Sequence, residues 1–286
     1  MTNYYDDPSL YDLEYEIRKE DIHFYIEKCH EHLNKNLKDH NKDKSKKLKV
    51  LELGCGTGRV SIPLAKEGFI ISAIDSDKKM LARAKEKALK ENLKIDFINA
   101  NFRDFNIGKK FDVVIMPFNS LQHLHRIKDI NKFFNNLKRH ISENGIFMFE
   151  VTNPDMDDLS RGPDDVVPYD SFNVIRNSKT GKLSRITNHQ NLGNQEKTQL
   201  LVIEDFLDYD VKNQIANFTL HYSMDYEEDV AILNISLRAF FPQELDAILY
   251  YNGFKILEKY GYFNGSPLTV KSPSQVVVCR IDKVII

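Results

Sequence analysis

Cysteine is scarce in this sequence and forms no recognisable motif. The 286 residues include three cysteines, Cys29, Cys55 and Cys279, which are far apart and contain no C-x-x-C pair. An odd number of isolated cysteines favours neither a disulfide framework nor a zinc site. We therefore expect reduced thiols and no bound metal, with Cys55 serving as a small loop residue.

The sequence also lacks an excess of either charge and any long apolar run. Lysine and arginine number 40 against 42 for aspartate and glutamate, so there is no electrostatic footprint of a nucleic-acid-binding protein. No stretch approaches the roughly 18 apolar residues of a membrane span, and the polar, acidic start contains no signal-peptide core. The default expectation is a soluble, cytoplasmic protein that binds neither membrane nor nucleic acid, folded as one large domain or as one domain with an insertion.

One stretch, Val50 to Arg59, organises the rest of the chain. It reads VLELGCGTGR, with glycines at 54, 56 and 58 between an apolar run and an amphipathic segment. This pattern predicts a strand, a tight loop and a helix, in which glycine permits positive φ angles and brings backbone N–H groups close to a ligand. A nucleotide-like cofactor is indicated, but the dinucleotide fingerprint G-x-G-x-x-G would need its third glycine where this chain has Arg59.

Strand and helix patterns alternate over residues 48–152, which predicts an α/β fold with a mostly parallel sheet and helices on both faces. A further helix and two strands are expected at the C-terminal end, giving seven strands in all. We expect strands at about 48–53, 69–74, 94–100, 111–116, 145–151, 255–260 and 275–281, and helices at 58–67, 77–91, 120–140 and 242–251.

Between these two parts, the pattern changes to alternating and β-branched runs. Turn signals such as those at 179–182 and 191–194 separate the runs, which predicts an inserted antiparallel β-meander of four or five strands. A lysine-rich stretch at 35–49 is read as a solvated connector. The predicted domains are an N-terminal helical cap at 1–47, the sheet domain at 48–152 and 241–286, and the β lobe at 153–240.

Candidate ligand-binding residues lie where the predicted parallel strands end, because open α/β sheets bind ligands at the carboxyl ends of their strands. Asp75 ends the second strand and suits the two hydroxyls of a ribose. Met80 could cover an adenine ring or belong to the core, and the amide of Asn101 could read an adenine edge. Phe102 is open to either a ligand or a packing role. The fourth strand leads into Pro117, Phe118, Asn119 and Ser120.

Taken together, the segment Glu52–Gly58, Asp75, the segment Asn101–Phe105 and the segment Phe111–Pro117 resemble the Rossmann-like (class I) S-adenosylmethionine-dependent methyltransferases. The resemblance covers residues 48–152, and residues 242–282 resemble the family's reversed final hairpin. Within the family, the chain looks like the small-molecule N- and O-methyltransferases. In those enzymes an inserted β-sheet closes over the acceptor and an N-terminal tyrosine segment folds over the cofactor; the candidates here are Tyr5, Tyr11 and Tyr15.

This resemblance implies S-adenosyl-L-methionine as cofactor and a small molecule as methyl acceptor. It places the three loop glycines at the methionine part, Asp75 at the ribose, and Asn101, where the family usually has aspartate, beside the adenine. Arg59 would meet the cofactor's carboxylate or form a salt bridge on a helix face. The expected cofactor-binding residues are Tyr11, Glu52, Gly54, Cys55, Gly56, Gly58, Arg59, Asp75, Ser76, Met80, Asn101, Phe102, Pro117 and Asn119.

Methyl transfer from a sulfonium has an activated leaving group, so the protein mainly aligns the acceptor with the methyl group and excludes water. A general base is needed only for an acceptor that is protonated at rest. His123, just past the fourth strand and with an expected pKa near working pH, is the candidate base. The alternative is a surface histidine of a helix, and His125, His189 and His221 have weaker claims.

Other functions are weighed against this one. Methyltransferases of DNA amino groups use an Asn/Asp-Pro-Pro-Tyr-like segment, which Met116 to Asn119 does not match, and residues 152–240 hold 15 acidic and 8 basic residues, which would repel a phosphate backbone and could attract a cationic amine. A nicotinamide-dependent oxidoreductase and a non-catalytic S-adenosylmethionine-binding module remain as alternatives. If the protein forms a homodimer, the β lobe is the expected surface.

Overall fold

The computed structural model describes residues 2–3, 7–37, 47–162, 164–176, 183–186, 198–225 and 231–282. The chain divides into two compact units. The sheet unit contains residues 18–155 and 238–286, and the β unit contains residues 1–17 and 156–237. The predicted helical cap at 1–47 is therefore divided, because its first helix packs within the β unit and its second helix packs within the sheet unit.

The sheet unit is built on seven strands in the order β12-β13-β6-β5-β2-β3-β4. Strand β13 is antiparallel to both of its neighbours, and the pairs among β2 to β6 are parallel. This arrangement confirms the predicted fold. The strands are β2 (Lys49–Leu53), β3 (Ile70–Asp75), β4 (Asp96–Asn99), β5 (Phe111–Met116), β6 (Ile141–Thr152), β12 (Phe254–Tyr260) and β13 (Ser274–Ile281).

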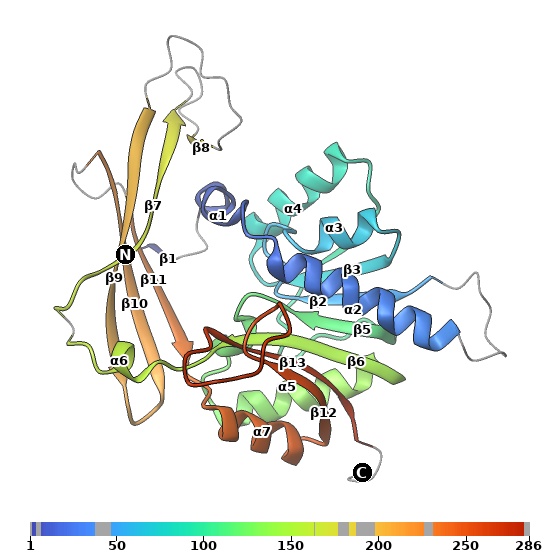
Figure 1. Ribbon diagram of the computed structural model, residues 1–286. Helices are drawn as coiled ribbons and strands as arrows, with labels where there is room; N and C mark the ends of the chain where they lie inside the picture. The colour runs from blue at the N-terminus through green and yellow to red at the C-terminus, as the bar shows by residue number, and fades with distance from the viewer. Residues whose placement is uncertain are drawn as a thin grey trace. The chain divides into compact units, whose positions relative to one another are not determined.

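Helices cover both faces of this sheet (Figure 1). On β5, Val113 and Ile115 face one core and Val114 and Met116 face the other, all fully buried. Burial on both faces explains why the parallel strands read as continuous apolar runs. One face carries α2 (Glu20–Leu37), α3 (Ser61–Lys66) and α4 (Lys78–Lys90), and the other carries α5 (Ile127–His140) and α7 (Pro242–Tyr251).

The helix predicted at 120–140 is two elements rather than one. A single 3-10 turn, η1 (Ser120–His123), is followed by α5. Arg126, between them, has extended backbone angles, with φ −109° and ψ 140°. The apolar spacing alone does not reveal this break.

The β unit contains the predicted antiparallel sheet, with two features that the pattern does not indicate. The strand order is β1-β11-β10-β9-β7-β8, so β7 lies between β8 and β9, and the N-terminal β1 joins β11 in parallel. Helix α1 packs on this sheet, where the Tyr222 hydroxyl donates to Glu14 at 2.8 Å. The elements are β1 (Thr2–Asn3), α1 (Pro8–Tyr15), α6 (Met156–Leu159), β7 (Val167–Arg176), β8 (Leu183–Arg185), β9 (Thr198–Asp210), β10 (Ile215–Met224) and β11 (Ala231–Arg238).

Several sequence expectations concern residues outside the described ranges: Tyr5, His189, the turns at 179–182 and 191–194, and most of the lysine-rich connector. Within the described ranges, all three cysteines are buried and free. No described helix is long and apolar enough to cross a membrane. The same ranges contain no cluster of three or more metal-ligating side chains.

Candidate functional site

The candidate site lies at the carboxyl ends of β2 and β5, which are neighbours in the sheet. The strand order reverses between them, and ligands of open α/β sheets bind at this kind of switch point. Residues 54–58, the glycine loop, follow β2. Residues Pro117–Ser120, the Phe118 turn, follow β5.

Packing and backbone angle together require glycine in the loop. Gly54, Gly56 and Gly58 have φ angles of 75°, 53° and 78°. A Cβ on Gly54 would lie 2.7 Å from Ser120 Oγ, and one on Gly58 would lie 3.3 Å from Ala84 Cβ. At Gly56 a Cβ would meet only the Met80 methyl group, at 3.9 Å. The loop therefore packs tightly at both ends and leaves room at its centre.

The backbone of the glycine loop is largely satisfied from within the protein. Four N–H groups donate internally: Gly54 and Cys55 to the Ile74 carbonyl at 2.9 Å each, Gly56 to Asp75 Oδ2 at 2.7 Å, and Gly58 to the Cys55 carbonyl at 2.9 Å. The expectation that N–H groups of the loop point at a ligand is wrong for these four. The side chains of Cys55 and Thr57 are buried, so what the loop offers a ligand is backbone surface at its glycines.

Asp75 is brought directly beside the glycine loop. Its two carboxylate oxygens accept hydrogen bonds from the N–H groups of Gly56 and Asp77, at 2.7 and 2.8 Å. Burial raises the pKa of Asp75, and these two hydrogen bonds oppose that rise. The Ser76 N–H is a third backbone donor to this carboxylate. Because an ionised carboxylate has about four acceptor positions, Asp75 keeps capacity for a further donor such as a ribose hydroxyl.

The other residues predicted to contact the cofactor near Asp75 differ in burial and in their partners. Met80 is 2 % exposed, in agreement with its alternative role as a core residue. The Asn101 amide oxygen accepts from the backbone and the guanidinium of Arg103, at 2.9 and 3.2 Å. Phe102 is half-buried and meets Phe133 edge-on, with ring centroids 6.1 Å apart. Ser76 is exposed, and its carbonyl accepts from Asn99.

Tyr11 belongs to the β unit, where its ring packs against Tyr15 with centroids 5.0 Å apart. Its contact with a cofactor stays a prediction.

Glu52 supports the loop from inside the sheet unit. Its side chain is 1 % exposed and accepts a hydrogen bond from the Ser61 hydroxyl of α3. Burial raises the pKa of Glu52 to about 8. The structure thus places this acid beneath the loop, joined to the helix that follows it.

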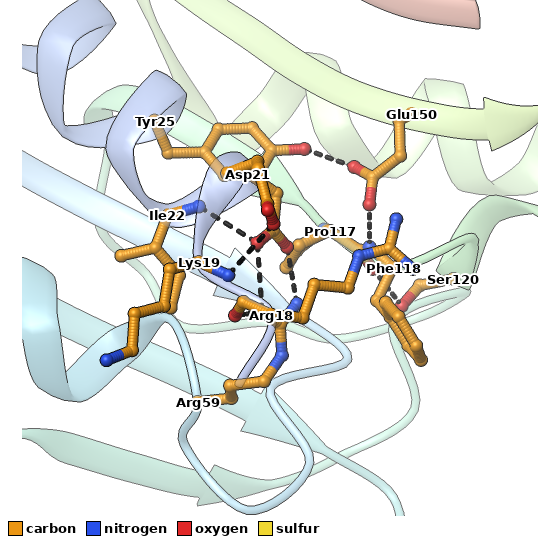
Figure 2. Close-up of polar contacts among 11 residues, drawn as sticks. Arg18, Lys19, Asp21, Ile22, Tyr25, Arg59, Pro117, Phe118, Ser120 and Glu150 are labelled. Carbon is orange, nitrogen blue, oxygen red and sulfur yellow. Dashed lines mark hydrogen bonds and ion pairs between the residues drawn. The ribbon is translucent and has the colours of Figure 1, made fainter. Parts of the chain in front are cut away.

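Arg59 forms a two-pronged ion pair with Asp21 of α2 (Figure 2). One prong measures 2.9 Å, the same nitrogen donates to the Arg18 carbonyl at 3.0 Å, and Asp21 is fully buried. Bidentate pairing of this kind fixes both side chains. Of the two roles expected for Arg59, the structure shows the salt bridge.

The Phe118 turn is the most strained part of the site. Phe118 and Asn119 have φ angles of 57° and 58°, a left-handed conformation that is costly for residues other than glycine. The Phe118 N–H donates to Glu150 of β6, which also accepts from the Tyr25 hydroxyl, as Figure 2 shows. Strain held by surrounding contacts is typical of functional sites.

Two guanidinium groups lie beside the Phe118 ring, that of Arg18 at 5.0 Å and that of Arg59 at 5.2 Å from the ring centroid. Burial, followed by the charge of Asp21, raises the pKa of Glu150 to about 7.

Asp21, Tyr25 and Glu150 were not identified from the sequence as residues of the site. The one available signal was that Glu150, like Glu52, is an acid within an apolar run of residues.

His123, the predicted general base, ends η1 and is half-buried. Burial, with a smaller effect from His125, lowers the pKa of His123 to about 4. The expectation that it titrates near working pH is therefore wrong. The ring is neutral at neutral pH and can accept a hydrogen bond, but it is a weak base.

This chain is similar to known methyltransferases. Residues 50–145 match the family model described as a methyltransferase domain. The ubiquinone biosynthesis O-methyltransferase of Rickettsia typhi is 34% identical over 123 residues, which are 43% of this chain and 48% of that protein. The chain thus spans about half the length of the curated relatives it matches.

Solved structures are similar over nearly the whole chain. An S-adenosylmethionine-dependent methyltransferase from Clostridium acetobutylicum superposes with a TM-score of 0.69 at 18% identity, covering 96% of each chain. An S-adenosylmethionine-bound amino pentose methyltransferase from Micromonospora echinaspora gives a TM-score of 0.62 at 15% identity, covering 98% of each chain. At these identities the similarity establishes a shared fold, including the β unit.

Proposed function

We propose that this chain, which carries a methyltransferase domain in a class I methyltransferase fold, transfers a methyl group from S-adenosyl-L-methionine to a nitrogen or oxygen of a small molecule. The observation that carries the proposal is the contact between the glycine loop and Asp75. The backbone nitrogen of Gly56 lies 2.7 Å from a carboxylate oxygen of Asp75, which retains acceptor capacity. A carboxylate acceptor beside open backbone surface suits an adenosyl group, whose ribose presents two adjacent hydroxyls.

In this proposal the bound cofactor supplies a methyl group on a positively charged sulfur. The glycine loop gives its amino-acid part room at Gly56, and Asp75 accepts from the ribose. Because Arg59 is paired with Asp21, the Arg18 guanidinium beside the same Phe118 ring is the better candidate for the cofactor's carboxylate. The residues therefore bind and orient the methyl donor without supplying covalent chemistry.

The acceptor is proposed to be an amine or hydroxyl of a small molecule, recognised by the β unit. The sugar acceptor named for the Micromonospora structure and the acidic composition of residues 152–240 support this class. With a pKa of about 4, His123 would orient a neutral amine by accepting its hydrogen bond, and an ammonium would have to lose its proton to solvent first. Cytoplasmic location and a homodimer through the β unit stay predictions.

Calorimetry tests this proposal without knowledge of the acceptor. S-Adenosylmethionine should bind the wild-type protein and NAD should not, which separates the methyltransferase from the oxidoreductase. Asp75→Ala should weaken S-adenosylmethionine binding by at least about tenfold, the effect of losing about 1.4 kcal/mol or more of charge-assisted hydrogen bonding.

Asp104→Ala, at an exposed aspartate paired with Lys132, is the matched control and should leave the affinity unchanged. Equal affinity in the wild type and Asp75→Ala would contradict the assigned role of Asp75. Turnover with any acceptor in a mass-spectrometric screen would exclude the non-catalytic alternative.

A further inference from the structure

The chain passes between its two units three times, between residues 17 and 18, 155 and 156, and 237 and 238. On the sheet-unit side, each passage has within a few residues of it a residue that contacts the segment from Phe118 to His125, through hydrogen bonds at two passages and through a ring contact at the third. We call this segment the junction. It contains Phe118 and Asn119 of the Phe118 turn, and η1, which ends at His123.

Gln122 is hydrogen-bonded to the backbone near two of the three passages. Its side chain is 4 % exposed. The amide oxygen accepts from the Thr152 N–H at 3.1 Å, and the amide nitrogen donates to the Arg238 carbonyl at 2.8 Å. Both ends of one buried side chain are thus bonded to backbone, three residues before one passage and at the first residue after another.

Further contacts join the junction to the same passages. The Arg238 guanidinium donates to the His125 carbonyl at 2.7 Å and to Glu244 at 2.7 Å. At the third passage, the Arg18 guanidinium lies 5.0 Å from the centroid of the Phe118 ring. These contacts involve residues of the sheet unit alone, and they bring all three passages to one short segment.

The junction also touches the candidate cofactor site. A Cβ on Gly54 would lie 2.7 Å from Ser120 Oγ, so the glycine loop and η1 are in close contact. A shift of either side is transmitted to the other, because packed interiors respond to displacements well below 1 Å.

We infer that the junction couples the cofactor site to the chain passages that carry the β unit, and that Gln122 is the positioning residue of this coupling. The inference rests on the proposed function, since it assigns to the β unit the recognition of the acceptor. Binding of the cofactor restricts the motion of η1. The two hydrogen bonds of Gln122 extend this restriction to the backbone at Thr152 and Arg238. Gln122 itself has no role in binding the cofactor.

Hydrogen exchange read by mass spectrometry tests this inference on the full chain, with S-adenosylhomocysteine as the probe. In the wild type, the probe should slow exchange several-fold in the glycine loop and also in peptides covering 150–158 and 236–242. In Gln122→Leu, the glycine loop should still respond and the probe should bind with unchanged affinity. The two passage peptides should no longer respond.

Gln122→Glu separates the two bonds. A carboxylate can still accept from the Thr152 N–H but cannot donate to the Arg238 carbonyl. Peptide 150–158 should therefore keep its response to the probe, whereas peptide 236–242 should lose it. This variant also serves if Gln122→Leu folds poorly.

Asn252→Leu is the matched control, because Asn252 is a buried amide that joins α7 to Asn131 of α5 at 3.1 Å, away from the junction. It should leave both passage responses intact. Wild-type responses in Gln122→Leu, or an equal loss in Asn252→Leu, would overturn the inference.

If the probe leaves the wild-type glycine loop unprotected, the proposed function is what fails. The bonds of Gln122 are then judged in the unliganded protein. Faster exchange of both passage peptides in Gln122→Leu supports its positioning role, and unchanged exchange overturns it.

Discussion

The glycine loop and the Phe118 turn follow neighbouring strands and solve the same backbone problem differently. Both contain left-handed residues. The loop uses glycine, for which this conformation is ordinary. The turn uses a phenylalanine, for which it costs roughly 1–2 kcal/mol, and an asparagine, which adopts it more readily than most other residues. The residue types of the loop therefore favour its conformation by themselves, whereas the conformation of the turn depends on contacts with other parts of the sheet unit.

The supports of the two segments differ accordingly. Beneath the loop, Glu52 accepts a hydrogen bond from the Ser61 hydroxyl, nine residues away. Beneath the turn, Glu150 accepts the Phe118 N–H itself and ties it to Tyr25, which is 125 positions from Glu150. A strained turn that is held by distant residues keeps its shape only while the whole sheet unit is intact.

The largest effect is expected where the two segments touch. In Gly54→Ala, the new Cβ would lie 2.7 Å from Ser120 Oγ on a backbone with φ of 75°. We expect a loss of about 2–4 kcal/mol in unfolding free energy, from backbone strain and overpacking together, and a loss of S-adenosylmethionine binding. Urea denaturation and calorimetry measure the two effects.

Gly68→Ala isolates the contribution of the backbone angle. Gly68 has φ of 87°, and a Cβ there would meet no atom within 4 Å. This change should cost only about 1–2 kcal/mol of strain and leave cofactor affinity unchanged. Equal stability losses in the two variants would mean that the contact between loop and turn has no special importance.

This contrast also explains what could be predicted from the sequence. Each feature of the loop side, the alternating glycines and the acid at the end of the next strand, is encoded within a few residues. Asp75 was therefore expected at the same edge of the sheet as the glycine loop, and in the structure its carboxylate accepts from the Gly56 N–H at 2.7 Å. The parallel strands with helices on both faces followed from the alternation of strands and helices over residues 48–152.

The turn side could not be predicted, because its determinants are tertiary. Asp21 and Arg59 are 38 positions apart. No local pattern distinguishes a phenylalanine held in a left-handed conformation from any other phenylalanine after a strand. The pKa of His123 depends on burial, which the sequence position alone did not reveal.

An intermediate effect is expected from the buried acids beneath the two segments. The pKa of Glu52 is about 8 and that of Glu150 about 7 in the folded protein, against roughly 4.3 in an unfolded chain. Above pH 4.3 the folded state therefore binds more protons than the unfolded state, so these groups make stability fall as pH rises. His123, with its lowered pKa, acts in the opposite direction only below about pH 6.5.

Between pH 6.5 and 8, His123 does not oppose the effect of the two acids, so the wild type should lose stability as pH rises. Glu52→Gln should remove about 1–2 kcal/mol of that fall, as measured by urea denaturation at both pH values. Glu91→Gln, at an exposed glutamate paired with Lys66, should reproduce the wild-type slope. A Glu52→Gln slope equal to that of the wild type would show that the acid beneath the loop is charged in the folded protein.

The smallest effect should come from Asn119 in the Phe118 turn, and its matched control is Asn92, a second asparagine with a left-handed φ of 55°. Replacing either residue by alanine should cost up to about 1 kcal/mol, and replacing either by glycine should change stability by only a few tenths. If the Phe118 turn serves the cofactor site, Asn119→Ala should also weaken S-adenosylmethionine binding and Asn92→Ala should not. Equal affinities of Asn119→Ala and Asn92→Ala would show that the Phe118 turn has a structural role only. The glycine loop would then account for recognition of the methyl donor without the turn.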